Sequence, residues 1–193
     1  MKFPLLRSLA MSGALCLVSG CIVLSVYPFY TARDLVSDPG LAGRWVKVGK
    51  TNETWQFTAA GEKSFLLTTT DENSTNGFEA HIFQLDQYQF LDLLTTNRET
   101  FLLPLHLISK FNRNDTNLTL PFMDYGWLAR LLETNGAAVR HITVPQEPGN
   151  TNGGNMVYLT STTPELQKFL LKYAADTNAF GTDSLVQLQR VSR

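Results

Sequence analysis

His81 and Asp92 are two side chains that could act as an acid–base pair, and they lie in neighbouring apolar segments joined by Asp86 and Gln87. If those two residues form a tight turn, the segments pair as antiparallel strands and His81 lies opposite Asp92. A carboxylate beside a histidine can fix the ring's tautomer so that it acts as a general base, and Glu79 on the same face could add a metal ligand. The commoner arrangement, which we expect here, is a cross-strand ion pair on a solvated face.

The same pairing sorts the other side chains of these segments into two faces. One face is wholly apolar and consists of Phe78, Ala80, Ile82, Leu91 and Leu93. We assign this face to the packed core. Because side chains alternate along a strand, a slip of one residue would exchange the two faces.

No further catalytic pattern accompanies the pair. His106 and His141 lack the spacing of a zinc site, and the chain has no nucleophile-elbow, metalloprotease or phosphate-loop motif. We therefore expect no metal and no cofactor. A hydrolase that uses His81 and Asp92 is the least favoured functional hypothesis.

The thiol of Cys21 is the second group that could do chemistry. Lys2 and Arg7 form a positive start, and residues 8–20 are uncharged and mostly apolar. This layout is typical of a secretory signal, so we expect the chain to be exported.

The residues Val18–Gly20, directly before Cys21, resemble the lipobox of bacterial lipoproteins. In that motif a branched apolar residue and two small residues precede a cysteine that is acylated and becomes the new N-terminus. The resemblance implies attachment to a membrane through acyl chains on Cys21, which together anchor a protein stably.

An uncleaved signal anchor is the alternative interpretation of this segment. No charged residue occurs between Arg7 and Arg33, so the span is long enough to cross a bilayer. Pro28 and the small residues before the cysteine favour the lipoprotein interpretation.

The lipoprotein interpretation divides the chain into a signal peptide (1–20), a lipidated N-terminus and lead-in (21–40) and a single β-rich domain (41–193). Cys16 leaves with the signal, so no thiol remains for a disulfide. We expect a periplasm-facing protein of the bacterial cell envelope. In an envelope with two membranes, Ile22 resembles the residue that follows the cysteine in lipoproteins of the outer one.

The composition is that of a folded protein that does not bind nucleic acid. Of the 193 residues, 44% are hydrophobic and 17% are charged, which is unlike a disordered chain. The net charge is −1, and it becomes −3 when Lys2 and Arg7 leave with the signal. A chain without a basic field has nothing to hold a polyanion.

The domain has the pattern of a mainly β protein with two packed helices. Apolar and polar residues alternate as in half-buried strands, and Gly, Asn or Asp separates many of the segments. We predict strands over 41–48, 53–58, 63–70, 78–85, 88–95, 103–111, 117–122, 141–144, 156–160 and 185–191. We predict helices over about Asp124–Asn135 and Pro164–Ala175. Short, regularly spaced strands favour an antiparallel barrel or sandwich.

The tripeptide Gly43–Trp45 at the start of the first of these strands, together with the order of elements, resembles the lipocalin or wider calycin plan. The resemblance implies an antiparallel barrel whose base the Trp closes and whose other end opens to an apolar ligand pocket. Trp55, Phe57 and Phe65 are then candidate lining residues, because a barrel interior needs large apolar side chains whether it is filled or hollow.

The aromatic run Tyr27–Tyr30 allows two interpretations. Its rings could pack against the domain, or they could touch the lipid interface. Together with Asp34–Val36 and Asp38–Pro39, this segment also resembles uncharacterised bacterial lipoproteins, a likeness that implies no activity.

Taken together, these patterns predict a lipid-anchored binding module of the envelope for a small apolar ligand. The alternative is an assembly lipoprotein with a filled interior that contacts another envelope protein.

Overall fold

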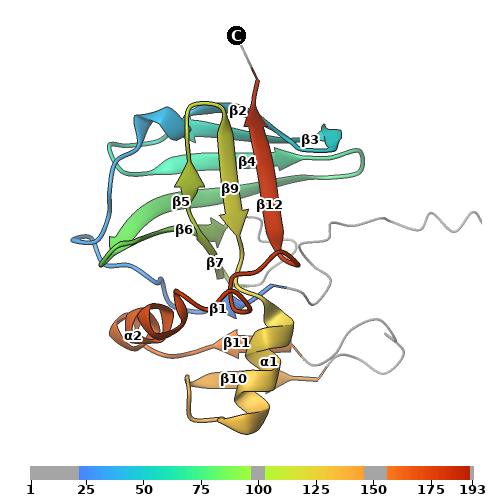
Figure 1. The fold of residues 1–193 in the computed structure, drawn as a ribbon. Coiled ribbons are helices and arrows are strands. Elements are labelled where there is room, and N and C mark those ends of the chain that lie inside the picture. Colours follow the sequence, from blue (N-terminus) through green and yellow to red (C-terminus); the bar gives the residue numbers. More distant parts are fainter. Residues whose placement is uncertain (1–21, 97–102, 146–155, 192–193) are drawn as a thin grey trace, which may run out of the picture.

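The computed structural model describes residues 22–96, 103–145 and 156–191. They form one mostly antiparallel sheet of twelve strands, in the order β10-β11-β1-β7-β6-β5-β4-β3-β2-β12-β9-β8 (Figure 1). The strands are β1 (Leu24–Ser25), β2 (Gly43–Lys47), β3 (Lys50–Ala59), β4 (Phe65–Thr70), β5 (Thr75–Leu85), β6 (Tyr88–Thr95), β7 (His106–Lys110), β8 (Asn112–Arg113), β9 (Asn117–Pro121), β10 (His141–Val144), β11 (Met156–Leu159) and β12 (Leu185–Arg190). The helices are the 3-10 helix η1 (Pro39–Leu41), α1 (Tyr125–Thr134) and α2 (Thr163–Tyr173).

The mainly β class, the ten predicted strands and the two predicted helices are confirmed. The strands β1 and β8 were not predicted, because two residues are too short to produce an alternating pattern. β1 belongs to the predicted lead-in, and it pairs with β11 on one side and with β7 on the other.

The predicted barrel is not confirmed, because the sheet is not closed. Strand β9 approaches β7 at one isolated bridge, between Ser109 and Phe122. The remainder of that edge of β7 pairs with β1, through His106 and Leu107. A strand edge can serve only one neighbour at each residue, so β1, β11 and β10 extend the sheet where β9 would have closed it.

Two groups of buried side chains hold the sheet together. The first, which we call the interior core, is enclosed by strands β2–β7, β9 and β12 and includes Trp45, Phe57, Leu67 and Ile82. It follows from alternation: along β4 every second side chain is buried and those between are exposed. In Figure 1 most of these strands form the upper part of the molecule, with β10, β11, α1 and α2 below.

The second group, which we call the helix core, lies between the helices and the outer face of β5, β6 and β7. Helix α1 contributes Trp127 and Leu128, and α2 contributes Leu166, Phe169 and Leu170. Leu131 and Leu132 of α1 also pack against this core, so the apolar side chains of each helix recur at spacings of three and four residues and lie on one face. The helix core covers the sheet face that carries His81 and Asp92.

We expect Asp124→Ala to lower the free energy of unfolding by about 1 kcal/mol. The Asp124 carboxylate accepts a hydrogen bond of 2.6 Å from the Trp127 backbone N–H at the start of α1. Asp124→Asn keeps an acceptor there and should retain most of the stability. Urea unfolding of both variants measures the difference, and equal losses would show that the cap is not what the aspartate supplies.

Candidate functional site

The predicted pairing around His81 and Asp92 is confirmed. The two residues are partners between β5 and β6, as are Phe83 and Phe90 closer to the turn. Asp86 adopts a left-handed conformation with φ of 48°, which a tight turn between antiparallel strands requires. The assignment of the apolar face to the packed core is also confirmed, because all five of its residues belong to the interior core.

The expectation of a solvated face around this pair is wrong. The side chain of Asp92 is completely buried, and His81 is 8% exposed. The aromatic residues of the lead-in cover them, since Phe29 is fully buried in the helix core and the Tyr30 ring lies 4.8 Å from the His81 ring. The structure therefore confirms the packing interpretation for these two rings, whereas Tyr27 is 48% exposed.

Asp92 bonds to groups from two other segments. Its Oδ1 lies 2.7 Å from Nδ1 of His106 on β7, and its Oδ2 accepts a hydrogen bond of 3.2 Å from the Phe29 backbone N–H. An ionised carboxylate can only accept, so Nδ1 of His106 donates. In a neutral ring this leaves Nε2 as the basic nitrogen.

His106 was not predicted to belong to this site. His106 lies beside Asp92 because of the register in which β6 and β7 pair. The segment between these two strands is too long for a turn rule to predict that register. The available signal was alternation, which puts His106 and Ile108 on one face of the strand predicted over 103–111.

His81 has different partners from those of Asp92. Its Nδ1 lies 3.0 Å from the Tyr30 hydroxyl, and its Nε2 lies 3.5 Å from Oε1 of Glu79. Burial lowers the pKa of His81, although the charges of Glu79 and Asp92 oppose this shift. Burial also raises the pKa of Tyr30 well above its ordinary value, and the same two carboxylates add to that increase. Both groups are therefore neutral at pH 7, with the His81 proton on Nε2 facing Glu79 and with Tyr30 donating to Nδ1.

We call Tyr30, Glu79, His81, Asp92 and His106 the polar cluster. Its Asp–His pair has the geometry of a base and its orienting carboxylate. Ser25, the partner of His106 across the β1–β7 ladder, is fully buried and donates to the Tyr27 carbonyl at 2.8 Å. The Ser25 proton is therefore directed at the Tyr27 carbonyl and not at the His106 ring. The polar cluster holds the lead-in against the sheet, because Phe29 and Tyr30 bond to Asp92 and His81.

The burial of His81 should make the stability of the protein depend on pH. Because its pKa is lowered on folding, the unfolded ring takes up a proton below about pH 6.5 while the folded ring does not. The free energy of unfolding should therefore fall as the pH drops from 6.5 until the folded pKa is passed. The carboxylates with lowered pKa, among them Asp34 and Glu53, act at lower pH, below about 5.

Urea unfolding at pH 7 and at pH 5.5 measures this slope. His81→Gln should flatten it, and His141→Gln, which changes a histidine outside the polar cluster, should leave it unchanged. An unaltered slope in His81→Gln would contradict the assignment.

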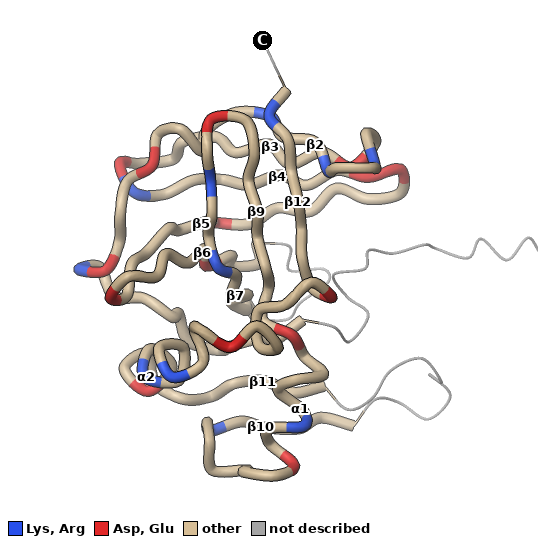
Figure 2. The backbone as a smooth tube through the Cα atoms, in the orientation of Figure 1, with Lys and Arg blue, Asp and Glu red and all other residues tan. Residues whose placement is uncertain are grey.

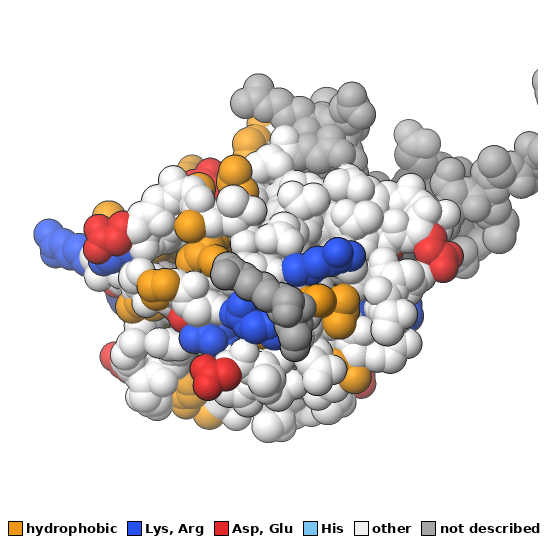
Figure 3. All heavy atoms as spheres, turned by 90° about the horizontal axis from the view of Figure 1, so that it is seen from above, with side chains coloured by type: hydrophobic (Ala, Val, Ile, Leu, Met, Phe, Trp, Pro, Cys, Tyr) orange, Lys and Arg blue, Asp and Glu red, His pale blue; other side chains and the backbone are white. Residues whose placement is uncertain are grey.

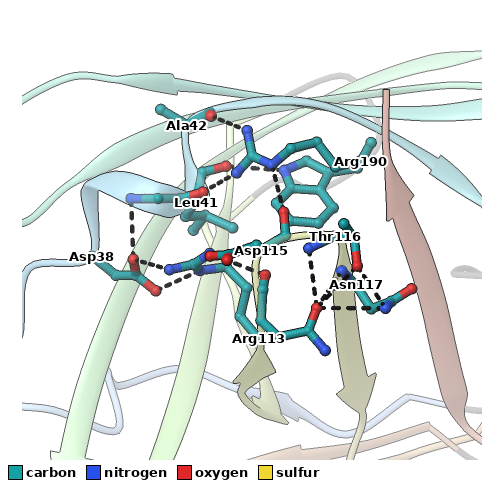
Figure 4. Close-up of polar contacts among 11 residues, drawn as sticks. Asp38, Leu41, Ala42, Arg113, Asp115, Thr116, Asn117 and Arg190 are labelled. Carbon is teal, nitrogen blue, oxygen red and sulfur yellow. Dashed lines mark hydrogen bonds and ion pairs between the residues drawn. The ribbon is translucent and has the colours of Figure 1, made fainter. Parts of the chain in front are cut away.

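A second polar arrangement lies at the end of the molecule where β12 terminates (Figure 4). The Arg113 guanidinium binds Asp38 in a bidentate manner, with both donor–acceptor distances 2.8 Å. The Arg190 guanidinium lies over the ring of Trp45, 4.4 Å from its centroid. It also donates to backbone carbonyls of Gly40, Ala42 and Asp115.

This arrangement explains the Gly43–Trp45 motif in physical terms. Gly43 has φ of +133°, which favours glycine, and a Cβ there would lie 2.8 Å from Nη1 of Arg190 and would displace that guanidinium. Trp45 is fully buried and donates from Nε1 to the Leu41 carbonyl at 2.9 Å. Basic side chains gather near the centre of this face when it is seen from above (Figure 3).

The candidate ligand-lining residues lie together inside the interior core. Trp55 is 6% exposed, Phe57 1% and Phe65 3%. A side chain that lines a hollow pocket keeps part of its surface open to water or ligand, and these three rings are almost completely enclosed. A bound molecule would therefore have to displace packed side chains.

Cys21 lies outside the described residues, directly before Ile22. No helix in the described ranges is both long and apolar enough to span a bilayer. Within the same ranges, no group of three or more His, Cys, Asp or Glu residues could hold a metal ion. No protein-family model, curated protein or solved structure matches the chain.

Proposed function

We propose that the protein is a lipoprotein of the bacterial envelope, attached to a membrane by acyl chains on Cys21, and that its domain works by contacting another envelope protein. The observation that carries the second half is the filled interior core. With Trp55, Phe57 and Phe65 almost completely enclosed, the molecule offers a partner its outer surface more readily than it offers a small ligand its interior.

The first half is supported by the lipobox-like residues before Cys21 and by the absence of a long tether after it. The described chain enters the sheet at β1, whose first residue is three positions beyond Cys21. A domain joined so closely to its anchor is held at the membrane surface, which we take to be the periplasmic side of the outer membrane where two membranes exist.

We also propose that the strands from β2 to β7, with β9 and β12, form a lipocalin-like barrel. Two contacts support this proposal by bringing the end of β9 against β7. One is the bridge between Ser109 and Phe122, and the other is the hydrogen bond of 3.1 Å from the Met123 N–H to the Ile108 carbonyl. Arg190 over Trp45 supplies a closed end of the kind that the lipocalin resemblance implies.

The anchor is tested by Cys21→Ser, with Cys16→Ser as the matched control. Cys21→Ser should abolish processing and acylation, so that the mature, lipid-modified species disappears from the membrane fraction. Cys16→Ser should be processed normally, since Cys16 lies within the signal. Mass spectrometry of the N-terminal peptide shows, for each variant, whether the signal has been removed and whether the N-terminus carries acyl chains. A membrane-bound Cys21→Ser protein of unchanged size would instead favour an uncleaved signal anchor.

The contact with a partner is tested by a photo-crosslinking residue at Val48 or Leu66, which are 56% and 52% exposed. In cells, one discrete adduct of fixed mass is expected at one or both positions, and no adduct is expected at Gln84 on β5. Extraction of the purified protein followed by mass spectrometry tests the alternative hypothesis, which is that the domain binds a small apolar ligand. A stoichiometric apolar molecule without any adduct would overturn the partner function in favour of ligand binding.

A further inference from the structure

An apolar face lies on the three strands at one end of the sheet, on the side away from the helices. Leu24, Tyr158 and Ile142 are successive partners across β1, β11 and β10. One step along, Met156 pairs with Val144, and Ile22 occupies the corresponding place before β1. We call this set the edge face: Ile22, Leu24, Ile142, Val144, Met156 and Tyr158.

The opposite side of the same strands is covered by the helices, since Val23, Val157 and Leu159 are buried in the helix core. On the edge face, burial decreases outward, because Leu24 belongs to the interior core and Ile22, Met156 and Tyr158 pack against it. Leu24 is 5% exposed and Met156 and Tyr158 are half-buried, whereas Ile142 is 53% exposed and Val144 43%.

The outermost strand is short and has no charged side chain of its own, and Arg140, directly before it, pairs with Glu165 on α2. Strand β10 is the last strand on its side of the sheet. Neither β10 nor β11 contains Lys, Arg, Asp or Glu (Figure 2). Sheet edges commonly carry charged residues that prevent association with other apolar surfaces, so an uncharged edge with exposed Ile and Val indicates a surface that is normally covered.

We propose that the exposed outer part of the edge face, which consists of Ile142 and Val144, rests in the headgroup and upper acyl region of the membrane to which the protein is anchored. This inference rests on the proposed acylation of Cys21. The acylated residue is the immediate neighbour of Ile22, and consecutive Cα atoms are about 3.8 Å apart. Two strand spacings of about 4.8 Å each then separate the position of Ile22 from β10. The exposed side chains therefore start within about 15 Å of the lipid anchor.

A second copy of the chain is the weaker candidate for this surface. Stable dimers bury about 1,200–2,000 Å² in total. Two exposed apolar side chains on a four-residue strand supply only a small part of that area. The bilayer needs no such area, because the anchor already holds the edge face beside it.

Single-cysteine variants of the full-length, acylated protein test the placement, since the mature chain has no other free thiol. Ile142→Cys and Val144→Cys would carry a nitrobenzoxadiazole label, with Thr143→Cys as the matched control. Thr143 is exposed on the same strand but belongs to the opposite face, because its partner is Val157. Val48→Cys, directly after β2, and Leu66→Cys, on β4, belong to strands of the upper part of the molecule, whereas β10 lies at its lower end (Figure 1).

The proteins are reconstituted in vesicles of phosphatidylethanolamine and phosphatidylglycerol that contain a lipid with a headgroup-proximal spin label. The expected result is quenching at positions 142 and 144 at least severalfold stronger than at 143, 48 and 66. Equal quenching at all five positions in vesicle-bound protein would overturn the inference. A crosslink between two copies at position 142 without lipid quenching would also overturn it, in favour of a dimer.

The failure of the anchor has a separate signature. If Cys21 is not acylated, the protein does not float with the vesicles and its N-terminal peptide has no added mass. In that case the proposed lipoprotein function is wrong. If the protein floats normally but positions 142 and 144 are not quenched, only the proposed placement of the edge face is wrong.

Discussion

Replacing Trp45 by alanine is expected to lower the free energy of unfolding by about 4 kcal/mol. The ring is fully buried in the interior core, its Nε1 donates to the Leu41 carbonyl, and its face carries the Arg190 guanidinium. Removal of the ring leaves a cavity, an unsatisfied carbonyl and a cation without its aromatic partner. Urea unfolding monitored by circular dichroism measures the loss.

Two comparisons separate these contributions. Trp45→Phe keeps an aromatic face but loses the indole N–H, so an intermediate loss is expected. Arg190→Lys keeps the charge but loses the planar fork that donates to three carbonyls, and a double-mutant cycle with Trp45→Ala should give a coupling of about 0.5–2 kcal/mol. A loss for Trp45→Ala no larger than that for Val48→Ala, at an exposed position, would contradict this account of the closed end.

Asp92→Ala is expected to lower the free energy of unfolding by about 3 kcal/mol. The carboxylate is completely buried and serves both the His106 ring and the Phe29 backbone N–H. Without it, two buried donors lose their acceptor, and the lead-in loses one of its ties to the sheet. Thermal or urea unfolding of the protein gives the magnitude, and hydrogen exchange at the Phe29 amide reports on the tie itself.

The control for this change is Asp92→Asn, which has the same shape. Its single carbonyl oxygen can accept from only one of the two donors, so a smaller loss than that of Asp92→Ala is expected. Asp86→Ala changes an exposed aspartate in the adjoining turn. If Asp92→Ala lost no more stability than Asp86→Ala does, the polar cluster would have no structural role.

Asp92→Ala also tests how the domain is held next to the proposed anchor. The lead-in begins at Cys21, and its strand β1 and its contacts with the polar cluster hold it against the sheet. In the proposed lipoprotein, a rigid connection of this kind would give the domain one orientation at the membrane, which the proposed placement of the edge face requires. A loosened lead-in in Asp92→Ala would therefore be expected to weaken the lipid quenching at positions 142 and 144.

Local patterns predicted most of the fold, because the information for each element lies within a few residues. The β5–β6 hairpin is the clearest instance: a two-residue turn and matching partners determine the register and the buried face. The cap at Asp124 and the three-four spacing of α1 are equally local. Strands β1 and β8 were not predicted, because a strand of two residues is too short to show an alternating pattern. Their pairing depends on neighbouring strands and not on their own sequence.

The candidate site depended on contacts between segments far apart in the chain. His106 reaches Asp92 only through the β6–β7 register, and Tyr30 reaches His81 across 51 positions. The same holds for Arg190, which contacts Trp45 because β12 pairs with β2. In each case the residue type was visible beforehand, but its partner was not.

The sequence by itself thus determined the signal-like start, the cysteine that follows it, the mainly β class and the places of the helices, since these depend on composition, period and capping over short windows. Only the tertiary structure decided that the face with His81 and Asp92 is buried, that the rings inside the sheet are packed and that the sheet is not closed. The physical reason is that burial and closure are properties of surfaces that distant segments share. Alternation along a strand says which side chains lie on one face, but not what will cover that face.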